Sequence, residues 1–265
     1  MYPINTLRNI ALSMCRSDYV FLVDVDFIPS ANLHNNVMKS RFFGKYFLRR
    51  NESRNITLIS NSNSSSVSAS SFLRRQDNVA LVLPAFELID SVVKNVHIRP
   101  QGSKSVVWNM SDDHSIPQEP ADLWLLFRKE QARPFHGQIC KHWYFFFIEW
   151  MNSILWSEYK SEYYAVEYDK NYEPYIITKR KGLRKYDERF RGYGLNKVIH
   201  IKMLAKLDFF RFFVYGNGFV ISKEHNKTQD GISWRTDLKK RKCMQWLGDR
   251  INEEIAAGIG TPTIT

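Results

Sequence analysis

Hydrophobic positions recur along this chain at two spacings, and each spacing predicts a different kind of element. After Pro3, one set of residues recurs at helical spacing, namely Ile4, Leu7, Arg8, Ala11, Leu12 and Cys15. This spacing predicts one helix within residues 1–18, which leads into a strand. The same spacing predicts further helices over residues 33–48, 121–131, 198–204 and 234–255.

Continuous or alternating apolar runs predict the strands. One buried strand is expected at residues 19–23, and another at 79–87 that is ended by its proline, Pro84. Other runs predict strands within residues 163–169 and from residue 173 onward. The long run 209–221 predicts two strands joined by a hairpin-like turn at Gly216-Asn217-Gly218.

Several segments show neither spacing. Residues 50–75 are rich in Ser and Asn, which predicts an exposed loop, and the last nine residues predict a disordered end. Residues 94–120 are irregular. Residues 134–156 are unusually aromatic, which fits either a packed core or a surface that stacks on the C–H faces of sugars.

Composition narrows the class of protein without fixing it. A chain of 265 residues with 44% hydrophobic content can bury one large core or two small ones. The formal charge of +11 predicts attraction to anions, among them nucleic acid, anionic membranes and phosphate-bearing or acidic sugars. No zinc-finger spacing or RNA-recognition signature is present, so we expect no nucleic-acid partner.

Two further patterns concern the cellular route. The sequence has no run of about 18 apolar residues and no basic-then-apolar secretion signal at its start. Triplets of the N-glycosylation form Asn-x-Ser/Thr do occur, and they indicate either passage through the secretory pathway or chance matches in polar loops. They begin at Asn51, Asn55, Asn63, Asn109 and Asn226.

The most informative polar residues are Asp24 and Asp26, which follow the first apolar run. Side chains two positions apart on an extended chain point to the same side, so both carboxylates would face one ion or phosphate. Paired hard oxygen ligands suit Mg²⁺ or Mn²⁺, and such a cation can hold a diphosphate. The alternative is that both are solvated turn carboxylates.

Together with four other stretches, this Asp-X-Asp segment resembles glycosyltransferase family 49, the family of the LARGE second catalytic domain and of a β-1,4-glucuronyltransferase. The stretches that carry the resemblance are Tyr2-Pro-Ile-Asn-x-Leu-Arg-Asn, Val20-Phe-Leu-Val-Asp-Val-Asp-Phe, Val82-Leu-Pro-Ala-Phe-Glu, Tyr172-Glu-Pro-Tyr and Tyr186-Asp-Glu-Arg-Phe-Arg-Gly-Tyr-Gly-Leu-Asn-Lys-Val-Ile-His. The resemblance implies an α/β, GT-A-type domain of Rossmann-like character with a central mixed sheet, over residues 1–250, followed by a tail at 251–265.

The resemblance also implies a chemistry, namely inverting transfer of a sugar from a UDP-sugar to a glycan or glycoprotein acceptor with Mn²⁺. Glucuronate or N-acetylglucosamine is the class of sugar expected. By position in the family pattern, Asp24 and Asp26 would be ligands of the metal and the diphosphate. His225 would be a third metal ligand, or else an ordinary surface histidine. Lys197 would pair with the diphosphate or with an acidic donor such as UDP-glucuronate.

An inverting transfer needs a general base near the acceptor hydroxyl. Many inverting GT-A enzymes have Gly-Glu-Asp after a Gly-aromatic-Gly element, whereas this chain has Leu195-Asn196-Lys197. The motif therefore does not supply the base. Asp187, Glu188 and Glu173 are the candidate bases, and for each the alternative is a structural ion pair.

The resemblance has consequences for what surrounds this segment. We expect the chain to lack the family's first strands and its membrane anchor, and the full-length form to be a Golgi membrane protein. A catalytically incomplete relative that binds glycans or partners is the alternative to an enzyme.

Overall fold

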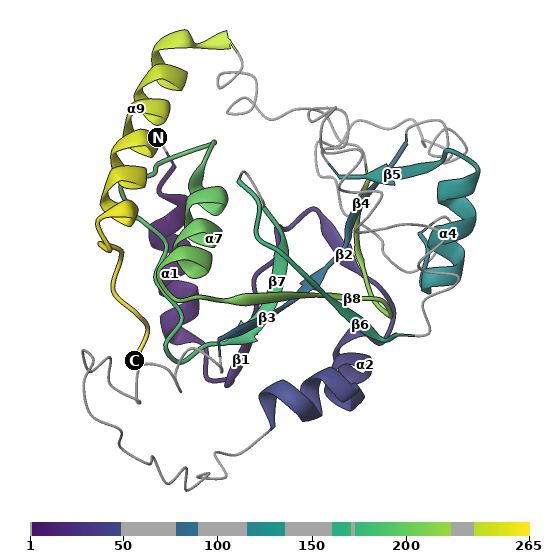
Figure 1. Cartoon of the computed structure of the whole chain (residues 1–265). Helices are drawn as coiled ribbons and strands as arrows, with labels where there is room; N and C mark the ends of the chain where they lie inside the picture. The colour runs from purple at the N-terminus through teal and green to yellow at the C-terminus, as the bar shows by residue number, and fades with distance from the viewer. Residues whose placement is uncertain (1, 49–77, 90–115, 136–160, 171–172, 224–235) are drawn as a thin grey trace, which may run out of the picture.

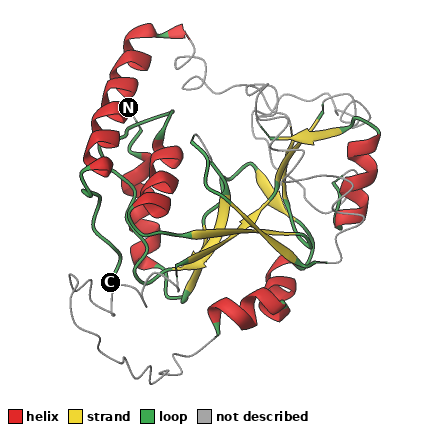
Figure 2. Cartoon of the chain, viewed as in Figure 1, coloured by secondary structure: helices red, strands yellow, loops and turns green. Residues whose placement is uncertain are grey.

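The computed structural model describes residues 2–48, 78–89, 116–135, 161–170, 173–223 and 236–265. Within these ranges the strands form two sheets, and helices lie around them (Figures 1 and 2). The five-stranded sheet has the order β1 (Tyr19–Phe21), β7 (Tyr175–Lys179), β3 (Val79–Leu83), β8 (Arg211–Tyr215) and β6 (Tyr163–Val166). The four-stranded sheet has the order β2 (Phe27–Pro29), β9 (Val220–Lys223), β4 (Ala85–Leu88) and β5 (Ala132–Pro134).

Both sheets are mixed. β3 pairs with β8 in parallel, β4 pairs with β9 in parallel, and the other pairs are antiparallel. The predicted α/β fold with a mixed central sheet is confirmed, and it is consistent with a GT-A-type domain.

The chain passes from the five-stranded to the four-stranded sheet three times, between β1 and β2, between β3 and β4, and between β8 and β9. The second passage is at Pro84, which has no N–H to donate to a ladder, so the run predicted as one strand at 79–87 is two strands in two sheets. The Pro84 carbonyl instead accepts a hydrogen bond from the Val220 N–H at 2.9 Å.

The predicted hairpin at Gly216–Gly218 is also wrong, because the strands on either side of it lie in different sheets. β8 pairs with β3 and β9 pairs with β4, each in parallel, so β8 and β9 do not pair with each other. A Cβ at Gly218 would meet the Leu33 Cδ1 atom at 2.5 Å and the Tyr215 ring at 3.0 Å, so a larger residue at this crossing would force these buried side chains to shift.

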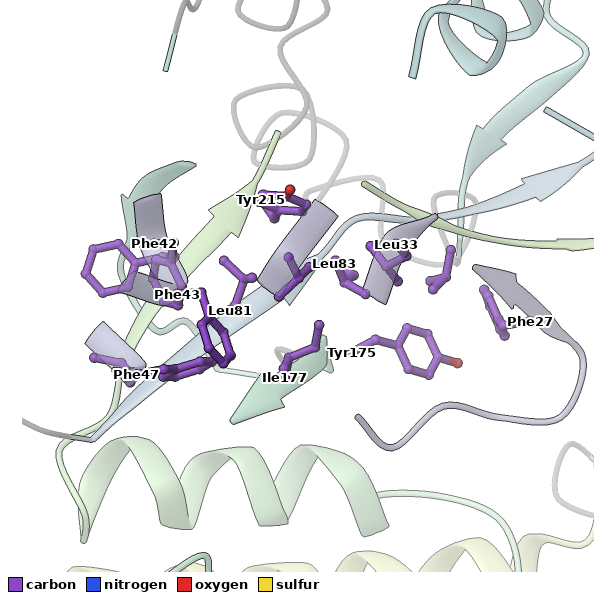
Figure 3. Packing of buried hydrophobic residues seen from close by; sticks show 14 residues of the cluster. Phe27, Leu33, Phe42, Phe43, Phe47, Leu81, Leu83, Tyr175, Ile177 and Tyr215 are labelled. Carbon is purple, nitrogen blue, oxygen red and sulfur yellow. The ribbon is translucent and has the colours of Figure 1, made fainter. Parts of the chain in front are cut away.

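β3 is the central strand, and both of its faces are covered, as expected for a continuous apolar run. Ala80 and Val82 pack towards α1 (Ile4–Met14) and α7 (Asn196–Lys206). Leu81 and Leu83 point to the opposite face, where they pack with α2 (Leu33–Lys39) and with the π-helical turn η1 (Phe43–Phe47) (Figure 3).

The helix predicted over residues 33–48 is broken at Ser40. The Ser40 hydroxyl donates to the Val37 carbonyl at 2.6 Å and accepts from the Phe43 N–H at 3.0 Å. This side chain therefore ends α2 and starts the next turn, as serine does when it competes for backbone groups.

Two more helices complete the described layers. α9 (Leu238–Ala256) packs through Met244 and Ile251 on α7, and α4 (Pro120–Arg128) packs through Leu123 on the four-stranded sheet (Figure 1). Among the helices in the described ranges, none has the length and apolar character needed to cross a membrane.

The prediction that the last nine residues form a disordered end is wrong. α9 continues to Ala256, and the residues after it pair with 182–185: the Lys185 N–H donates to Pro262, the Gly182 N–H to Ile264, and the Ile264 N–H to Leu183. Only 4% of Ile264 is exposed. Backbone pairing and this buried side chain hold the C-terminal segment on the domain.

Several predictions fall outside the described residues and stay predictions. They are the Ser/Asn-rich loop at 50–75, almost all of the irregular and aromatic segments, and the five glycosylation triplets.

Replacing Ile264 tests whether the C-terminal segment is part of the core. Ile264→Ala should lower the free energy of unfolding by about 2 to 4 kcal/mol, because it leaves a cavity among packed side chains. Ile259→Ala is the matched control, because Ile259 is 58% exposed. Denaturant unfolding measures both, and equal small effects would show that the segment is not part of the core.

Candidate functional site

The two aspartates lie on a tight turn at the first passage between the sheets. The Phe27 N–H donates to the Asp24 carbonyl at 3.1 Å, so Val25 and Asp26 are the central residues of a turn that joins β1 to β2. The expectation of an extended chain at these positions is therefore wrong. Val25 and Asp26 are exposed, whereas the Asp24 side chain is 35% exposed.

Three elements converge on the Asp24 carboxylate. Lys197, in the first turn of α7, donates to Oδ2 at 2.8 Å, and the hydroxyl of Tyr175, the first residue of β7, donates to the same oxygen at 2.8 Å. Arg8, on α1, lies 3.3 Å from Oδ1. Burial works to raise the pKa of Asp24, but these partners outweigh it and the pKa is lowered. Asp24 is therefore held as a carboxylate.

Asp26 acts on the same cluster. The pKa of the Tyr175 hydroxyl is raised, first by burial, then by the charge of Asp24 and its hydrogen bond, and further by Asp26. Figure 3 shows the Tyr175 ring among the core side chains with its hydroxyl at their edge. Tyr175 thus stays protonated and remains a hydrogen-bond donor to Asp24.

Arg8 is a site residue that the sequence prediction missed. It is buried, and its Nη1 donates to Asn196 Oδ1 at 2.9 Å and to Asn5 Oδ1 at 3.2 Å. Its guanidinium also lies over the Tyr186 ring, 5.2 Å from the centroid. The sequence feature that could have indicated Arg8 is a polar face of α1, because Asn5, Arg8 and Asn9 lie together on the buried side of this helix.

Of the three candidate bases, Glu173 is the one that reaches this cluster. Its Oε1 lies 3.5 Å from Lys197 Nζ, and its side chain is 31% exposed. Glu173 is therefore both connected to Asp24 through Lys197 and open to solvent.

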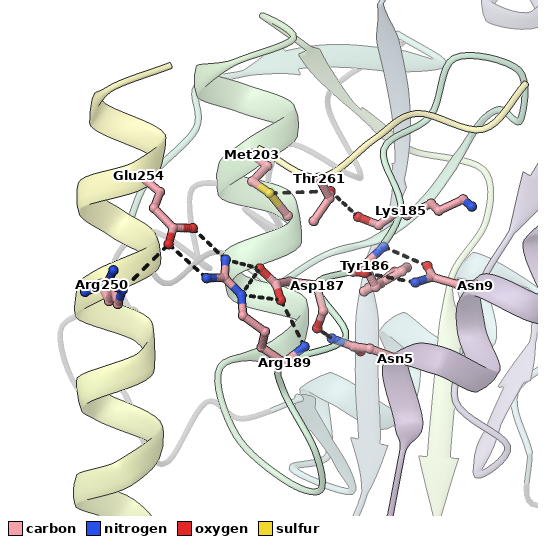
Figure 4. Close-up of polar contacts among 10 residues, drawn as sticks. All are labelled: Asn5, Asn9, Lys185, Tyr186, Asp187, Arg189, Met203, Arg250, Glu254 and Thr261. Carbon is pink, nitrogen blue, oxygen red and sulfur yellow. Dashed lines mark hydrogen bonds and ion pairs between the residues drawn. The ribbon is translucent and has the colours of Figure 1, made fainter. Parts of the chain in front are cut away.

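The contacts of Asp187 are those of an ion pair that supports the fold (Figure 4). Arg189 donates to its Oδ2 at 2.7 Å and to Glu254 of α9 at 2.6 Å, and only 5% of the Asp187 side chain is exposed. The carbonyl of Asp187 accepts from Asn5 Nδ2 at 2.8 Å. This residue joins α1, α9 and the 186–190 segment.

Glu188 also makes contacts with α1. Asn9 Nδ2 and the Thr6 hydroxyl donate to its carboxylate at 2.8 and 2.9 Å. These two hydrogen bonds lower the pKa of Glu188. A carboxylate with a lowered pKa is a weaker proton acceptor.

The donors present suit a metal that is shared with a phosphate ligand. His225 lies outside the described residues, and within the described ranges no group of three or more His, Cys, Asp or Glu side chains is gathered to hold a metal. Cations such as Mg²⁺ are often bound by one or two carboxylates together with substrate phosphates. Asp24 and Asp26 fit that role, although Lys197 and Tyr175 already bind Oδ2 of Asp24.

Comparison with known sequences shows which family the chain is part of. Residues 1–258 match the family described as "Glycosyl-transferase for dystroglycan". The chain belongs to this family. The family resemblance seen in the sequence motifs is thereby confirmed.

The relatives of this family member are distant. It is 27% identical over 270 residues to "Xylosyl- and glucuronyltransferase LARGE2" of Rattus norvegicus, covering 100% of this chain and 30% of that protein. It is 25% identical to "Glycosyltransferase-like protein LARGE" of Caenorhabditis elegans (98% and 33% covered) and to "Glycosyltransferase-like protein gnt14" of Dictyostelium discoideum (96% and 34%). The chain spans about a third of the length of these relatives.

A buried histidine lies beneath the site. His200 of α7 stacks on the ring of Tyr186 at 3.7 Å, on which Arg8 also rests. Burial disfavours the charged imidazolium and lowers the pKa of His200 to about 3, and the charge of Arg8 acts in the same direction. Within the described part of the chain, its Nδ1 has no hydrogen-bond partner. His200 is therefore a neutral core residue.

This burial predicts a pH dependence of stability. Between pH 6.5, the ordinary pKa of histidine, and about 3, the unfolded chain binds a proton that the folded chain does not. Stability is therefore lost as the pH falls below 6.5, by up to about 1.4 kcal/mol per pH unit.

His200→Phe and His200→Gln should not show this loss. The measurement is the difference in unfolding free energy between wild type and each variant from pH 7 to pH 5. Parallel profiles for all three proteins would contradict a neutral, buried His200.

Proposed function

We propose that this chain is the sugar-transferring part of a metal-dependent, inverting glycosyltransferase that uses a UDP-sugar and a glycan or glycoprotein acceptor. The observation that carries the proposal is the Asp24–Asp26 turn with Lys197 and Arg8 around it, in a chain of this family. The relatives' printed names support a glucuronate or related donor rather than N-acetylglucosamine. A Golgi location belongs to the same proposal.

Asp24 and Asp26 would hold a Mn²⁺ ion together with the diphosphate of the donor. When bound, the metal supplies Lewis-acid stabilisation of the departing UDP. Two cationic side chains, those of Arg8 and Lys197, lie beside the turn. Their positive charge would attract the negative charge of a diphosphate. Both side chains come from helices packed on the same sheet face, so their positions are fixed by the core.

Glu173 is our candidate for the general base. Its carboxylate would take the proton of the acceptor hydroxyl as that oxygen attacks the anomeric carbon and the bond from this carbon to the UDP oxygen breaks. Its partial exposure leaves room for an acceptor, and its contact with Lys197 places it next to the Asp24 cluster. Asp187 and Glu188 are the weaker candidates, because their carboxylates are bonded to Arg189 and to α1 respectively.

The first test is binding of UDP, measured by titration calorimetry with and without Mn²⁺. We expect binding that requires the metal and is lost in Asp24→Asn/Asp26→Asn. Asp249→Asn, at an exposed position of α9, is the control and should bind as wild type does. A folded wild-type chain that binds no UDP under either condition would overturn the proposal in favour of a catalytically incomplete relative.

The second test separates the candidate bases. Glu173→Gln should lower kcat by about 10²- to 10⁴-fold, with Mn²⁺-dependent UDP affinity little changed, because a general base acts only in the chemical step. Asp187→Asn should lower the unfolding midpoint instead. The rate is measured as UDP release from UDP-glucuronate in the presence of glycosylated dystroglycan, the protein that the family's description names. A Glu173→Gln variant with unchanged kcat would exclude this residue.

A further inference from the structure

We propose that Lys197 is an exchangeable internal cation, which occupies the Asp24 carboxylate until a divalent metal displaces it and frees its ammonium group for the diphosphate. This inference rests on the proposed function and deepens it. It concerns which of three positively charged groups, the metal, Lys197 and Arg8, bind the Asp24 carboxylate in each state of the site.

The argument begins with the oxygen atoms of Asp24. Oδ2 accepts from both Lys197 and Tyr175, each at 2.8 Å, and Oδ1 accepts from Arg8 at 3.3 Å. A carboxylate oxygen has two lone pairs, so Oδ2 is fully used. A metal that binds Asp24 through both oxygens, or through Oδ2 alone, must displace one of these donors.

Arg8 is held too firmly to be the donor that leaves. Its Nη1 is bonded to Asn5 and Asn196, and its guanidinium plane lies over Tyr186. Asn196 is itself fixed by a hydrogen bond from its Nδ2 to the Gly192 carbonyl at 3.2 Å. Moving Arg8 would break this whole set of contacts.

Among the residues that the structure describes, the contacts of Lys197 Nζ are all with the cluster that the metal would enter. They are Asp24 Oδ2, Glu173 Oε1 at 3.5 Å, and Tyr175, through its hydroxyl at 3.3 Å and its ring at 4.4 Å from the centroid. An ammonium on a flexible four-carbon stem can turn away without any change in the backbone. Lys197 is therefore the donor that can be exchanged.

The charges favour this exchange. Lys197 contacts the carboxylates of Asp24 and Glu173, and Arg8 contacts that of Asp24, so two positive charges face two negative ones. A divalent cation would give this cluster an excess of positive charge, and it would repel the ammonium at the same carboxylate oxygen. A diphosphate then offers the displaced ammonium new acceptors.

Two opposite effects of one substitution follow. In the absence of nucleotide, Lys197 competes with the metal, so removing its charge should tighten metal binding. With the metal bound, Lys197 helps to hold the diphosphate, so the same substitution should weaken nucleotide binding. A lysine that served only as a diphosphate anchor would produce the second effect alone.

The experiment measures Mn²⁺ binding to the nucleotide-free protein by the electron paramagnetic resonance signal of the free ion. Lys197→Met should bind Mn²⁺ at least about tenfold more tightly than wild type, since no charge-assisted hydrogen bond has to be broken. Its UDP affinity at saturating Mn²⁺ should fall at least about fivefold. Lys206→Met, in the last turn of the same helix, is the matched control and should change neither value.

The outcomes are distinct. Lys197→Gln replaces Lys197→Met if the latter does not fold, and Lys197→Arg, which keeps the charge, should not tighten Mn²⁺ binding. Mn²⁺ affinity that is unchanged or weaker in folded Lys197→Met or Lys197→Gln would overturn the exchange while leaving the metal-dependent function intact. Absence of Mn²⁺ binding in wild type and all variants, with UDP still bound, would overturn both the exchange and the proposed metal.

Discussion

The described site depends on one interaction, the pairing of the partly buried, negatively charged Asp24 carboxylate with hydrogen-bond donors and cations. A carboxylate at the position of Asp24 is costly unless it is paired, and here its partners come from α1, β7 and α7. Each partner is fixed in turn, Arg8 by two asparagines and Tyr175 by the core around Phe27. The geometry of the turn is therefore a property of the packed domain rather than of the local sequence.

The sequence predicted the α/β fold and most of the elements, because the central strand and α7 have apolar patterns of the right period. It did not predict where the chain changes sheet, since Pro84 and Gly218 act there through pairing with distant segments. The C-terminal segment was likewise invisible to pattern reading, because its contacts with 182–185 are mostly backbone hydrogen bonds. The segment has two isoleucines, and the sequence does not indicate that Ile264 is buried while Ile259 is exposed.

The site was predictable in part. Asp24 and Lys197 were chosen by their place in the family motifs, and the structure brings them together at 2.8 Å. Arg8 was missed because helical spacing was taken to bury apolar residues, whereas α1 buries Asn5, Arg8 and Asn9 and exposes Leu7, Ile10 and Met14. Buried polar side chains of this kind are stable when each has a hydrogen-bond partner, which a one-dimensional pattern does not show.

The three passages between the sheets have a consequence for how the described domain comes apart. Each passage runs directly from a strand of one sheet to a strand of the other, so neither sheet can lose its strands without pulling on its neighbour. Such interlacing couples the two sheets into one cooperative unit, in which partial opening is rare. Because the aspartate turn is itself one of these passages, its geometry persists only while both sheets are intact.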